Sequence, residues 1–239
     1  MSPTANQLPF TKMQAQGNDF IVLNGLTTEL PKLSNEFVRR ITERRYGIGC
    51  DQLLVLEKSE DNDAHMRIFN NDGSAAANCG NGLRCVGKLL IQQLGKECVS
   101  IALADRNVNA EATINGICVD MGAATVTDSN DVHVDVHVGN EHRVFFEATE
   151  AFPSDRNVEI VTGQIANHAY IDIIGRGAGR TLACGTGACA TAAAIWHIEG
   201  EVRPLTIEMP GGTVTISGCP KNIKLEGPVT QTFEGVFSL

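Results

Sequence analysis

The sequence predicts an α/β protein built from two similar domains, and three observations support this prediction. The chain has 239 residues, 43% of them hydrophobic, which suits one large domain or two small ones that each bury a core. Short runs that alternate polar and apolar residues outnumber the helix-like runs. The segment "ANCGNGLRC", residues 77–85, returns as "ACGTGAC", residues 183–189. With Cys79 and Cys184 lying 105 residues apart, this recurrence predicts an internal duplication.

The first half of the chain contains strand-like runs and two helix-like runs. Strands are expected at residues 10–13, 20–24, 52–56, 66–69, 99–103 and 117–121, between Gly, Asn and Asp turns. A surface helix is expected over residues 34–45, because Ser34 can cap it and apolar residues recur at helical spacing from Phe37 to Ile41. The apolar run over residues 80–94 predicts a second helix.

The second half repeats this order. Strands are expected at residues 132–138, 143–146, 158–161, 169–174, 205–209 and 213–216, and a helix at residues 185–198. The last two strands are joined by a Pro-Gly-Gly turn at residues 210–212. No low-complexity linker is present, so the boundary between the domains is expected in the soft stretch 122–130.

Composition limits the partners that the chain can have. A formal net charge of -9 and a pI near 5.1 argue against nucleic acid or an anionic membrane, because both favour clustered Lys and Arg. No apolar run approaches the roughly 18 residues of a membrane span. The start, MSPTANQLPF, lacks a basic region followed by an apolar one. We therefore expect a cytoplasmic protein with no membrane or nucleic-acid partner.

The eight cysteines predict neither disulfides nor a metal centre. A chain of this length with a sizeable core does not need disulfides, so most of the cysteines are expected to be buried thiols. No Cys-x-x-Cys pair occurs. His133 and His137 have the spacing of a helical metal pair, but the alternation between them is that of a strand, which separates the two imidazoles by ~13 Å. We expect no metal.

Each repeated motif places a cysteine directly before a Gly-x-Gly at the start of an apolar helix. The first turn of a helix offers unpaired N–H groups and a partial positive charge, which bind a carboxylate and lower the pKa of a nearby thiol. If a pseudo-twofold axis relates the two domains, Cys79 and Cys184 face one cleft from opposite sides. One thiolate could then remove a Cα proton while the other thiol protonates the opposite face. The pattern predicts inversion at carbon, with no pyridoxal cofactor.

Further motifs carry a resemblance to a known family. They are "GNDF" (17–20), "GIGCDQ" (47–52), "FNNDGS" (69–74), "GNEH" (139–142), "RNVE" (156–159), "RGAG" (176–179), "PGG" (210–212) and "GP" (227–228). Together with the cysteine motifs, they resemble over nearly the whole chain the diaminopimelate epimerases. These are cofactor-independent enzymes that interconvert LL- and meso-diaminopimelate, a precursor of lysine and peptidoglycan.

The resemblance implies roles for individual residues. Cys79 and Cys184 correspond to the acid/base thiols, and His142 is expected beside Cys79, where it could exchange a proton with that thiol. Gly80, Asn81, Gly185 and Thr186 would present main-chain N–H groups to the reacting carboxylate. The rest of the substrate would be bound by Asn18, Gln52, Asn70, Asn140, Asn157 and Arg176. The planar guanidinium of Arg176 suits a distal carboxylate.

The resemblance also implies a fold and an assembly. It implies two α/β domains, each a strongly curved, largely antiparallel sheet around a central helix, with the active site in the cleft between the domains. The last strand returns to the first domain, which would comprise residues 1–122 and 229–239, with residues 123–228 forming the second. The family forms homodimers through the C-terminal region, where Phe233 stands in place of the usual tyrosine.

Three positions depart from the family pattern. Gly175 replaces a glutamate that normally precedes the arginine, and Arg180 replaces a second acidic residue. Glu141 replaces a proline. Losing a carboxylate and gaining a cation near the substrate changes electrostatic energies by several kcal/mol, about 4 for one pair at 4 Å in an effective dielectric of 20. Such a change could alter the choice of substrate.

Other interpretations of the same residues stay open. Cys79 and Cys184 could be small buried hydrophobes, His142 a structural histidine, Arg176 a surface charge and the asparagines turn residues. Cys85 and Cys189 also repeat, but inside the helices, and are expected in the core. The same two-thiol chemistry could act on a different amino acid. A dinucleotide-binding or non-catalytic protein is a further alternative, because "GTGACA" at 185–190 fits Gly-x-Gly-x-x-Ala with Glu208 downstream.

Overall fold

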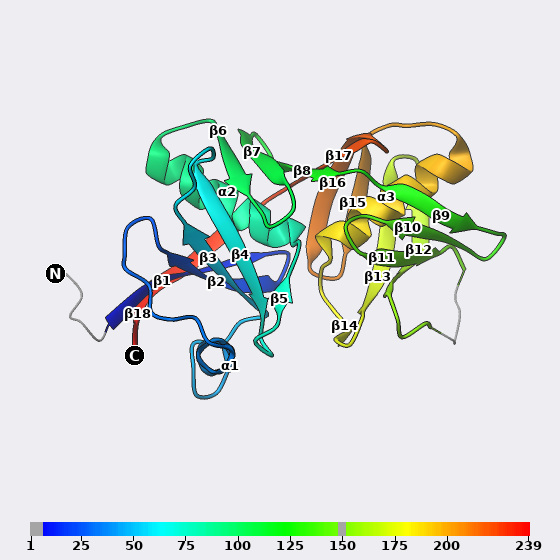
Figure 1. Ribbon diagram of the computed structural model, residues 1–239. Helices are drawn as coiled ribbons and strands as arrows, with labels where there is room; N and C mark the ends of the chain where they lie inside the picture. Colours follow the sequence, from blue (N-terminus) through cyan, green and yellow to red (C-terminus); the bar gives the residue numbers. More distant parts are fainter. Residues whose placement is uncertain (1–6, 148–151) are drawn as a thin grey trace. The chain divides into compact units, whose positions relative to one another are not determined.

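The computed structural model describes residues 7–147 and 152–239, which form two compact units (Figure 1). Unit 1 contains residues 7–15, 19–112 and 229–239. Unit 2 contains residues 16–18 and the described part of 113–228. The α/β class that the sequence predicts is confirmed, since strands predominate and the described residues form three helices.

Unit 1 is a sheet that holds one long helix. Its strands are β1 (Gln7–Ala15), β2 (Asn18–Asn24), β3 (Gln52–Glu57), β4 (Ala64–Asn70), β5 (Ala75–Ala76), β6 (Cys98–Ala102), β7 (Asn107–Thr113) and β18 (Thr230–Ser238). They pair in the order β18-β1-β2-β3-β4-β6-β7, with β5 on β4. The pairs β2–β3 and β4–β6 are parallel. Helix α2 (Gly80–Leu94) packs on β1 and β6, and the short α1 (Asn35–Thr42) packs on β3.

Unit 2 is a second sheet around a second long helix, α3 (Gly185–Glu199). Its strands are β8 (Gly116–Gly122), β9 (Thr125–Ser129), β10 (His133–His137), β11 (Glu141–Phe145), β12 (Asn157–Ile165), β13 (His168–Gly175), β14 (Gly179–Arg180), β15 (Leu205–Met209), β16 (Gly212–Cys219) and β17 (Asn222–Gly227). They pair in the order β9-β10-β11-β12-β13-β15-β16-β17-β8, with β14 on β13. The pairs β11–β12 and β13–β15 are parallel.

The two units share one topology. In each, a parallel strand pair, an antiparallel strand pair and a short strand lead into the long helix. The strand after the helix then pairs in parallel with the last long strand before it, β6 with β4 and β15 with β13. Both long helices end at a left-handed glycine, Gly95 (φ 65°) and Gly200 (φ 69°), a conformation that favours residues without a Cβ. Unit 1 receives its outermost strand, β18, from the C-terminus, and this strand pairs with β1.

The register gives residue correspondences between the units. Phe20 pairs with Gln52 across β2 and β3, and His142 pairs with Asn157 across β11 and β12. Phe20 therefore corresponds to His142 and, two residues further along the next strand, Leu54 corresponds to Glu159. Cβ atoms built on the equivalent glycines of the two long helices agree with this match. The atom nearest to such a Cβ belongs to Leu54 for Gly82 and to Glu159 for Gly187.

The two long helices are buried to different extents. Every residue of α3 from Gly185 to Trp196 is buried, because strands from β9 to β12 and from β15 to β17 surround it, and its small alanines permit the close approach. Helix α2 is buried only on one face beyond its first two turns, and Gln92 to Leu94 are exposed. The expected span of α2 is confirmed. The surface helix expected over 34–45 is shorter, because Glu43 has an extended backbone and ends α1 after Thr42.

Some strands were not predicted from local pattern. The strands β7 and β17 contain charged or Asn residues that weaken the period-two signal, and β9 lies in the stretch expected to be a soft boundary. Strand β9 exists because it pairs with β10. The strand pair β8–β17 places residues 116–122 in unit 2.

The expectation that most cysteines are buried is wrong. All eight are free thiols, of which Cys50, Cys85 and Cys189 are buried, and the last two confirm their expected place in the core. Cys98 and Cys219 are exposed because each lies at the end of a strand.

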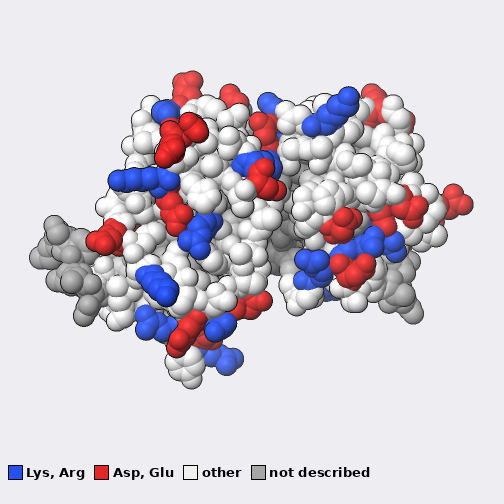
Figure 2. All heavy atoms as spheres, viewed as in Figure 1, with Lys and Arg blue, Asp and Glu red and all other residues white. Residues whose placement is uncertain are grey.

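Charges are interspersed on the surface. On the face shown in Figure 2, Lys and Arg side chains alternate with Asp and Glu on both units. Among the described residues, no helix has both the length and the apolar character needed to cross a membrane.

Candidate active site

Cys79 is the N-cap of α2. Its backbone is extended (φ -155°, ψ 101°), and its Sγ accepts a hydrogen bond from the N–H of Gly82 at 3.3 Å. Its carbonyl oxygen accepts the first helical bond, from Leu83 at 2.9 Å. The sulfur therefore occupies the place that a serine or aspartate oxygen takes at an ordinary helix start. A thiol held here faces the partial positive charge of the helix N-terminus.

Cys184 has the same local geometry at the start of α3. Its backbone is extended (φ -141°, ψ 110°), and its Sγ accepts from the N–H of Gly187 at 3.3 Å. Its carbonyl accepts from Ala188 at 2.9 Å. The duplicated sequence motif thus produces two thiols in equivalent positions, each at a helix end that can bind an anion.

The thiol of Cys79 is desolvated, and a buried cation acts on it. Burial raises the pKa of Cys79 to about 11, although the Gly82 N–H and the positive charge of Arg84 act in the opposite direction. Arg84 is fully buried, and its Nη2 donates to Asn81 Oδ1 at 2.5 Å. The Oδ1 of Asn81 therefore accepts from Arg84, and its main-chain N–H interacts with the Cys79 sulfur.

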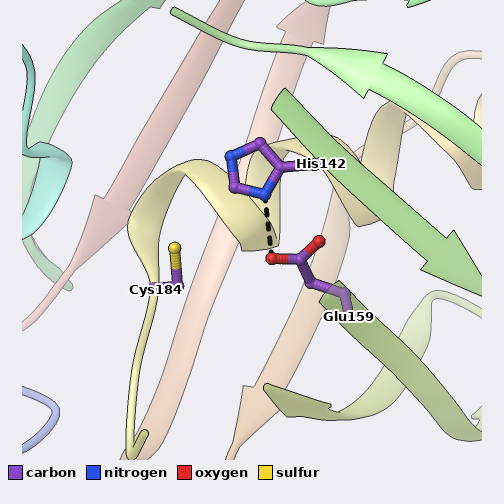
Figure 3. A group of neighbouring side chains, drawn as sticks. All are labelled: His142, Glu159 and Cys184. Carbon is purple, nitrogen blue, oxygen red and sulfur yellow. Dashed lines mark hydrogen bonds and ion pairs between the residues drawn. The ribbon is translucent and has the colours of Figure 1, made fainter. Parts of the chain in front are cut away.

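The surroundings of Cys184 are a titratable pair. Three atoms lie within 4.8 Å of one another: a ring nitrogen of His142, a carboxylate oxygen of Glu159 and the Sγ of Cys184 (Figure 3). His142 comes from β11, Glu159 from β12, and both side chains are fully buried. Thr186 Oγ1 lies 3.4 Å from the sulfur.

Both nitrogens of the His142 ring are hydrogen-bonded. Nδ1 lies 2.9 Å from Glu159 Oε1, and Nε2 lies 2.9 Å from Asn140 Oδ1. The structure groups His142 with Cys184 of its own unit, because β11, which carries His142, packs on α3. Its expected place beside Cys79 of the other unit stays a prediction.

The predicted binding residues Gln52 and Asn70 lie together in unit 1. They are register partners on β3 and β4, and Gln52 Nε2 donates to Asn70 Oδ1 at 2.9 Å. Asn70 Nδ2 in turn donates to Ser74 Oγ at 3.0 Å. Both side chains are half-buried. Two adjoining amides at the end of a strand pair provide donors and acceptors for a polar substrate.

The other side chains predicted to hold the rest of the substrate belong to unit 2. Asn157 Oδ1 accepts from the main-chain N–H of Arg176 at 3.0 Å, so Asn157 holds the loop that carries the arginine. The side chain of Arg176 is exposed. Asn18, at the start of β2, and Asn140 are half-buried. Gly185 and Thr186 form the first turn of α3, as Gly80 and Asn81 form that of α2.

Two residues near the thiols were not predicted as site residues. Arg84 lies within the quoted motif "ANCGNGLRC", and Glu159 lies within the quoted motif "RNVE". A signal existed in both places, because a charged residue stands in an otherwise apolar run that the pattern predicts to be buried. The apparent repeat of Cys85 and Cys189 is also inexact. Five residues after each N-cap cysteine, Arg84 corresponds to Cys189.

Two of the three residues that depart from the family pattern, Gly175 and Arg180, lie on the β13–β14 hairpin, and the third, Glu141, begins β11. Gly175 pairs with Gly179 and contributes no side chain. Arg180 Nη1 donates to Asp172 at 2.9 Å, and both side chains are exposed. The charge of Arg180 is therefore largely compensated by a carboxylate of its own hairpin and screened by solvent.

Two clusters have the donor types of a metal site. Cys184, His142 and Glu159 would suit zinc by chemistry, but both nitrogens of His142 are used in hydrogen bonds. The other cluster is Asp128, His133 and Asp135, in which the Asp135 carboxylate accepts bonds from Arg143 and Arg156 at 2.6 to 2.7 Å. Neither cluster, as it stands, offers a metal three uncommitted ligands.

Solved structures define the class of protein first. The chain superposes on a phenazine biosynthesis protein of the PhzF family from Bacillus anthracis with a TM-score of 0.76 and 17% identity, covering 98% of this chain and 99% of the other. It also superposes on a hydroxyproline epimerase from Agrobacterium vitis with a TM-score of 0.74 and 14% identity, covering 98% and 93%. At these identities the likeness establishes the fold, which the chain shares with known epimerases.

Sequence comparison establishes the family. The family model described as diaminopimelate epimerase matches residues 10–127 and 129–231. The diaminopimelate epimerase of Sphingopyxis alaskensis is 36% identical over 262 aligned positions, covering 95% of this chain and 96% of its own. That of Burkholderia pseudomallei is 34% identical over 286 positions, covering 98% and 99%. The chain belongs to the diaminopimelate epimerase family, as its motifs predicted.

Proposed function

We propose that this protein interconverts LL- and meso-diaminopimelate by acid/base chemistry at Cα, with Cys79 and Cys184 as the two proton-transfer groups and without a pyridoxal cofactor. The observation that carries the proposal is the equivalence of the two cysteines. Each is the N-cap of a long helix, with its sulfur 3.3 Å from the N–H three residues ahead. Membership of the diaminopimelate epimerase family supplies the substrate.

The chemistry requires stabilisation of a carbanion-like charge. Loss of the Cα proton places negative charge on the carboxylate, and preorganised N–H donors stabilise such charge by about 3 kcal/mol each in other enzymes. First-turn N–H groups point out of a helix end and meet this need. We assign this role to the main-chain groups of Gly80 and Asn81 on α2 and of Gly185 and Thr186 on α3.

The burial of Cys79 favours its protonated form. With a pKa of about 11, Cys79 holds its proton near pH 7 and is ready to act as an acid. Cys184 is then the group that removes the Cα proton in that direction, while His142 beside it is the second catalytic group. In the reverse direction the roles exchange, because each half of the cycle leaves the proton on the opposite sulfur.

The remainder of the substrate would meet the polar side chains near the thiols. Gln52 with Asn70 on unit 1, and Asn18, Asn140 and Asn157 on unit 2, are proposed to hold its amino and carboxyl groups. The exposed guanidinium of Arg176 is proposed to bind the distal carboxylate in a bidentate manner. The homodimer implied by the resemblance stays a prediction, with the exposed Phe233 on β18 as its proposed contact.

A second candidate is the same chemistry on a different amino acid. Gly175 favours it, because the family's carboxylate at that position is replaced by a residue without a side chain. The compensation of Arg180 by Asp172 opposes a large change in local charge. A panel of single amino acids, including proline and hydroxyproline, separates the two candidates by the rate of Cα deuterium uptake.

Exchange in heavy water tests the mechanism. The wild-type protein should incorporate deuterium at Cα of LL- and meso-diaminopimelate while it inverts that centre. The variants Cys79→Ala and Cys184→Ala should each lose at least about 10³-fold in the rate of inversion, because a missing acid or base cannot be replaced at the same position. The exposed Cys219 is the control, and Cys219→Ala should retain the wild-type rate. Unchanged turnover in both site variants would reject the two-thiol mechanism.

A further inference from the structure

Glu159 is a buried carboxylate with an incomplete set of hydrogen bonds. Its exposure is 0%, and its Oε1 lies 2.9 Å from the Nδ1 of His142. Its Oε2 is buried and has no hydrogen-bond partner among the residues that the structure describes. An ionised carboxylate in this state costs several kcal/mol unless a positive charge lies beside it. Something at this place must therefore offset the cost.

The hydrogen bonds limit the proton arrangements open to the pair. Nε2 of His142 lies 2.9 Å from Asn140 Oδ1, an oxygen that only accepts, so this contact is a hydrogen bond when Nε2 carries the proton. The contact between Nδ1 and Glu159 Oε1 requires one more proton between them. With both protons on the ring, His142 is an imidazolium and Glu159 its carboxylate, and the buried pair is neutral as a whole. With one proton fewer, an isolated negative charge would be buried.

The fold itself does not require this pair. At the equivalent positions of unit 1, the same topology places Phe20 and Leu54, which are buried and apolar. Replacing a well-packed apolar pair by a buried ion pair seldom adds stability. The polar pair in unit 2 is thus explained by what it does to its third neighbour, the Cys184 sulfur within 4.8 Å.

We infer that Glu159 is a positioning residue for Cys184, acting through His142: it holds the imidazole ring in place and keeps its second proton next to the sulfur. The inference rests on the proposed function, in which Cys184 transfers a proton. When Cys184 is a thiolate, the imidazolium lies beside it as a counter-charge. Glu159 does not touch the substrate. Its negative charge neutralises the positive charge of the imidazolium when the Cys184 sulfur has taken up the Cα proton.

Few other ionisable groups act on this cluster. On the helix itself, Cys189 is the nearest by sequence, and it is buried. Asp135 on β10 is held by Arg143 and Arg156, and Asp128 on β9 is exposed beside His133. Strands β15, β16 and β17 also pack on α3, and their buried residues carry no charge, since they are aliphatic residues, methionine or glycine. Among the described residues of unit 2, His142 and Glu159 are therefore the titratable side chains grouped with Cys184.

Alkylation of Cys184 measures this charge without any substrate. Iodoacetamide reacts with the thiolate, so the rate at which Cys184 is modified, measured against pH by mass spectrometry of fragments that separate it from Cys189, gives a midpoint. Glu159→Gln keeps the shape and a hydrogen-bond acceptor but removes the carboxylate, so the ring loses its second proton. Without a cation beside it the thiolate is less favoured, and the midpoint should rise by about one to two pH units.

The control is another buried carboxylate of the same unit. Asp135→Asn also replaces a buried acid by an amide, and it should lower stability while leaving the Cys184 midpoint within about 0.3 pH units of wild type. Epimerase activity should fall about 10²-fold in Glu159→Gln, within the range of acid/base contributions. A Glu159→Gln protein with lower activity at every pH and an unmoved midpoint would show a merely structural role and overturn the inference.

A measurement on the wild-type protein covers the case in which the variant does not fold. In ¹⁵N spectra of the histidine rings, His142 should keep Nε2 protonated at pH 7 to 8, with Nδ1 sharing a proton with Glu159. An unprotonated Nε2 would overturn the inference. Both readouts are independent of turnover. Failure of the proposed function would instead appear as a wild-type protein that alkylates as expected yet leaves both diaminopimelate isomers unchanged.

Discussion

The helix starts at Cys79 and Cys184 have the same backbone and different surroundings. Each cysteine caps a helix of 15 residues and accepts a bond from the N–H three residues ahead at 3.3 Å. In unit 1 the equivalent strands hold the apolar Phe20 and Leu54. The charges that act on Cys79 come from Arg84 inside the helix, which lowers its pKa, and more weakly from Asp51, which raises it. Around Cys184, the equivalent strands contribute the titratable His142 and Glu159.

This difference shows how a duplicated site can serve an asymmetric task. An epimerase needs one protonated and one ionised thiol at the start of each half-reaction, which two identical environments would not provide. A permanent cation beside Cys79 cannot change its charge, because arginine stays protonated at any working pH. A histidine–glutamate pair can move a proton within itself. The units have kept the geometry of the thiols and diverged in how the protonation of each is controlled.

The largest expected effect tests the space behind each helix start. In Gly187→Ala, the new Cβ would lie 2.2 Å from Glu159 Oε1 and 2.9 Å from its Cδ, and the fully buried side chain has no room to move away. We expect a loss of about 3 kcal/mol in the free energy of unfolding, from urea titration. In the matched variant Gly82→Ala, the Cβ would lie 3.2 Å from the Leu54 methyl groups, and the loss should be about 1 kcal/mol.

Equal losses in these two glycine variants would break the comparison. They would mean that Glu159 yields as readily as a leucine methyl group and is not held by His142. A larger loss for Gly82→Ala would have the same meaning.

The second test compares the acidic residues at the entries of β2 and β11. Asp19 and Glu141 occupy equivalent positions, one residue before Phe20 and His142. Burial raises the pKa of Asp19, but bonds from Arg44 and Lys12 outweigh it and lower the pKa to about 2. Glu141 is exposed, and among the described residues it forms an ion pair with His137, at 2.6 Å. We therefore expect the stability of unit 1 to depend on Asp19, and the stability of unit 2 not to depend on Glu141.

The sign of the pH dependence follows from the lowered pKa of Asp19. Its stabilisation is fully present above the unfolded pKa of about 4 and is lost as the pH falls through about 2. Asp19→Asn should therefore cost about 2 kcal/mol at pH 7, and the difference from wild type should shrink below pH 4. Glu141→Gln should change the free energy of unfolding by less than about 0.5 kcal/mol at either pH. A cost for Asp19→Asn that does not vary with pH would contradict this account.

The helices and thiols could be predicted because their signals are local. An apolar run after Cys-Gly-x-Gly is enough to place α2 from Gly80 to Leu94, and the duplicated motif is enough to pair Cys79 with Cys184. Strand β9 could not be predicted, because its residues are mostly exposed and only the pairing with β10 orders them.

The neighbours of each thiol depend on register, which local pattern does not contain. The resemblance gives His142 a catalytic role, and the sheet adds that this residue is grouped with Cys184 of its own unit. Glu159 was quoted within a motif but had no role until the pairing of β11 with β12 placed it two residues from the partner of His142. A glutamate between Val158 and Ile160 in a buried strand was the available signal.

The smallest expected effect sharpens the comparison on the side of Cys79. Arg84→Met keeps much of the buried volume but removes the cation that opposes the rise in the pKa of Cys79. The Cys79 thiolate should become rarer, so alkylation of Cys79 at pH 8 should slow by about tenfold, which is about 1.4 kcal/mol, while the rate for Cys184 stays unchanged. Arg84→Lys is the matched variant. It retains a positive charge and should restore most of the rate, even though the planar hydrogen bond to Asn81 is lost. If Lys and Met slow Cys79 equally, then Arg84 acts by holding Asn81 and the first turn of α2 in place, and the electrostatic half of the comparison is wrong.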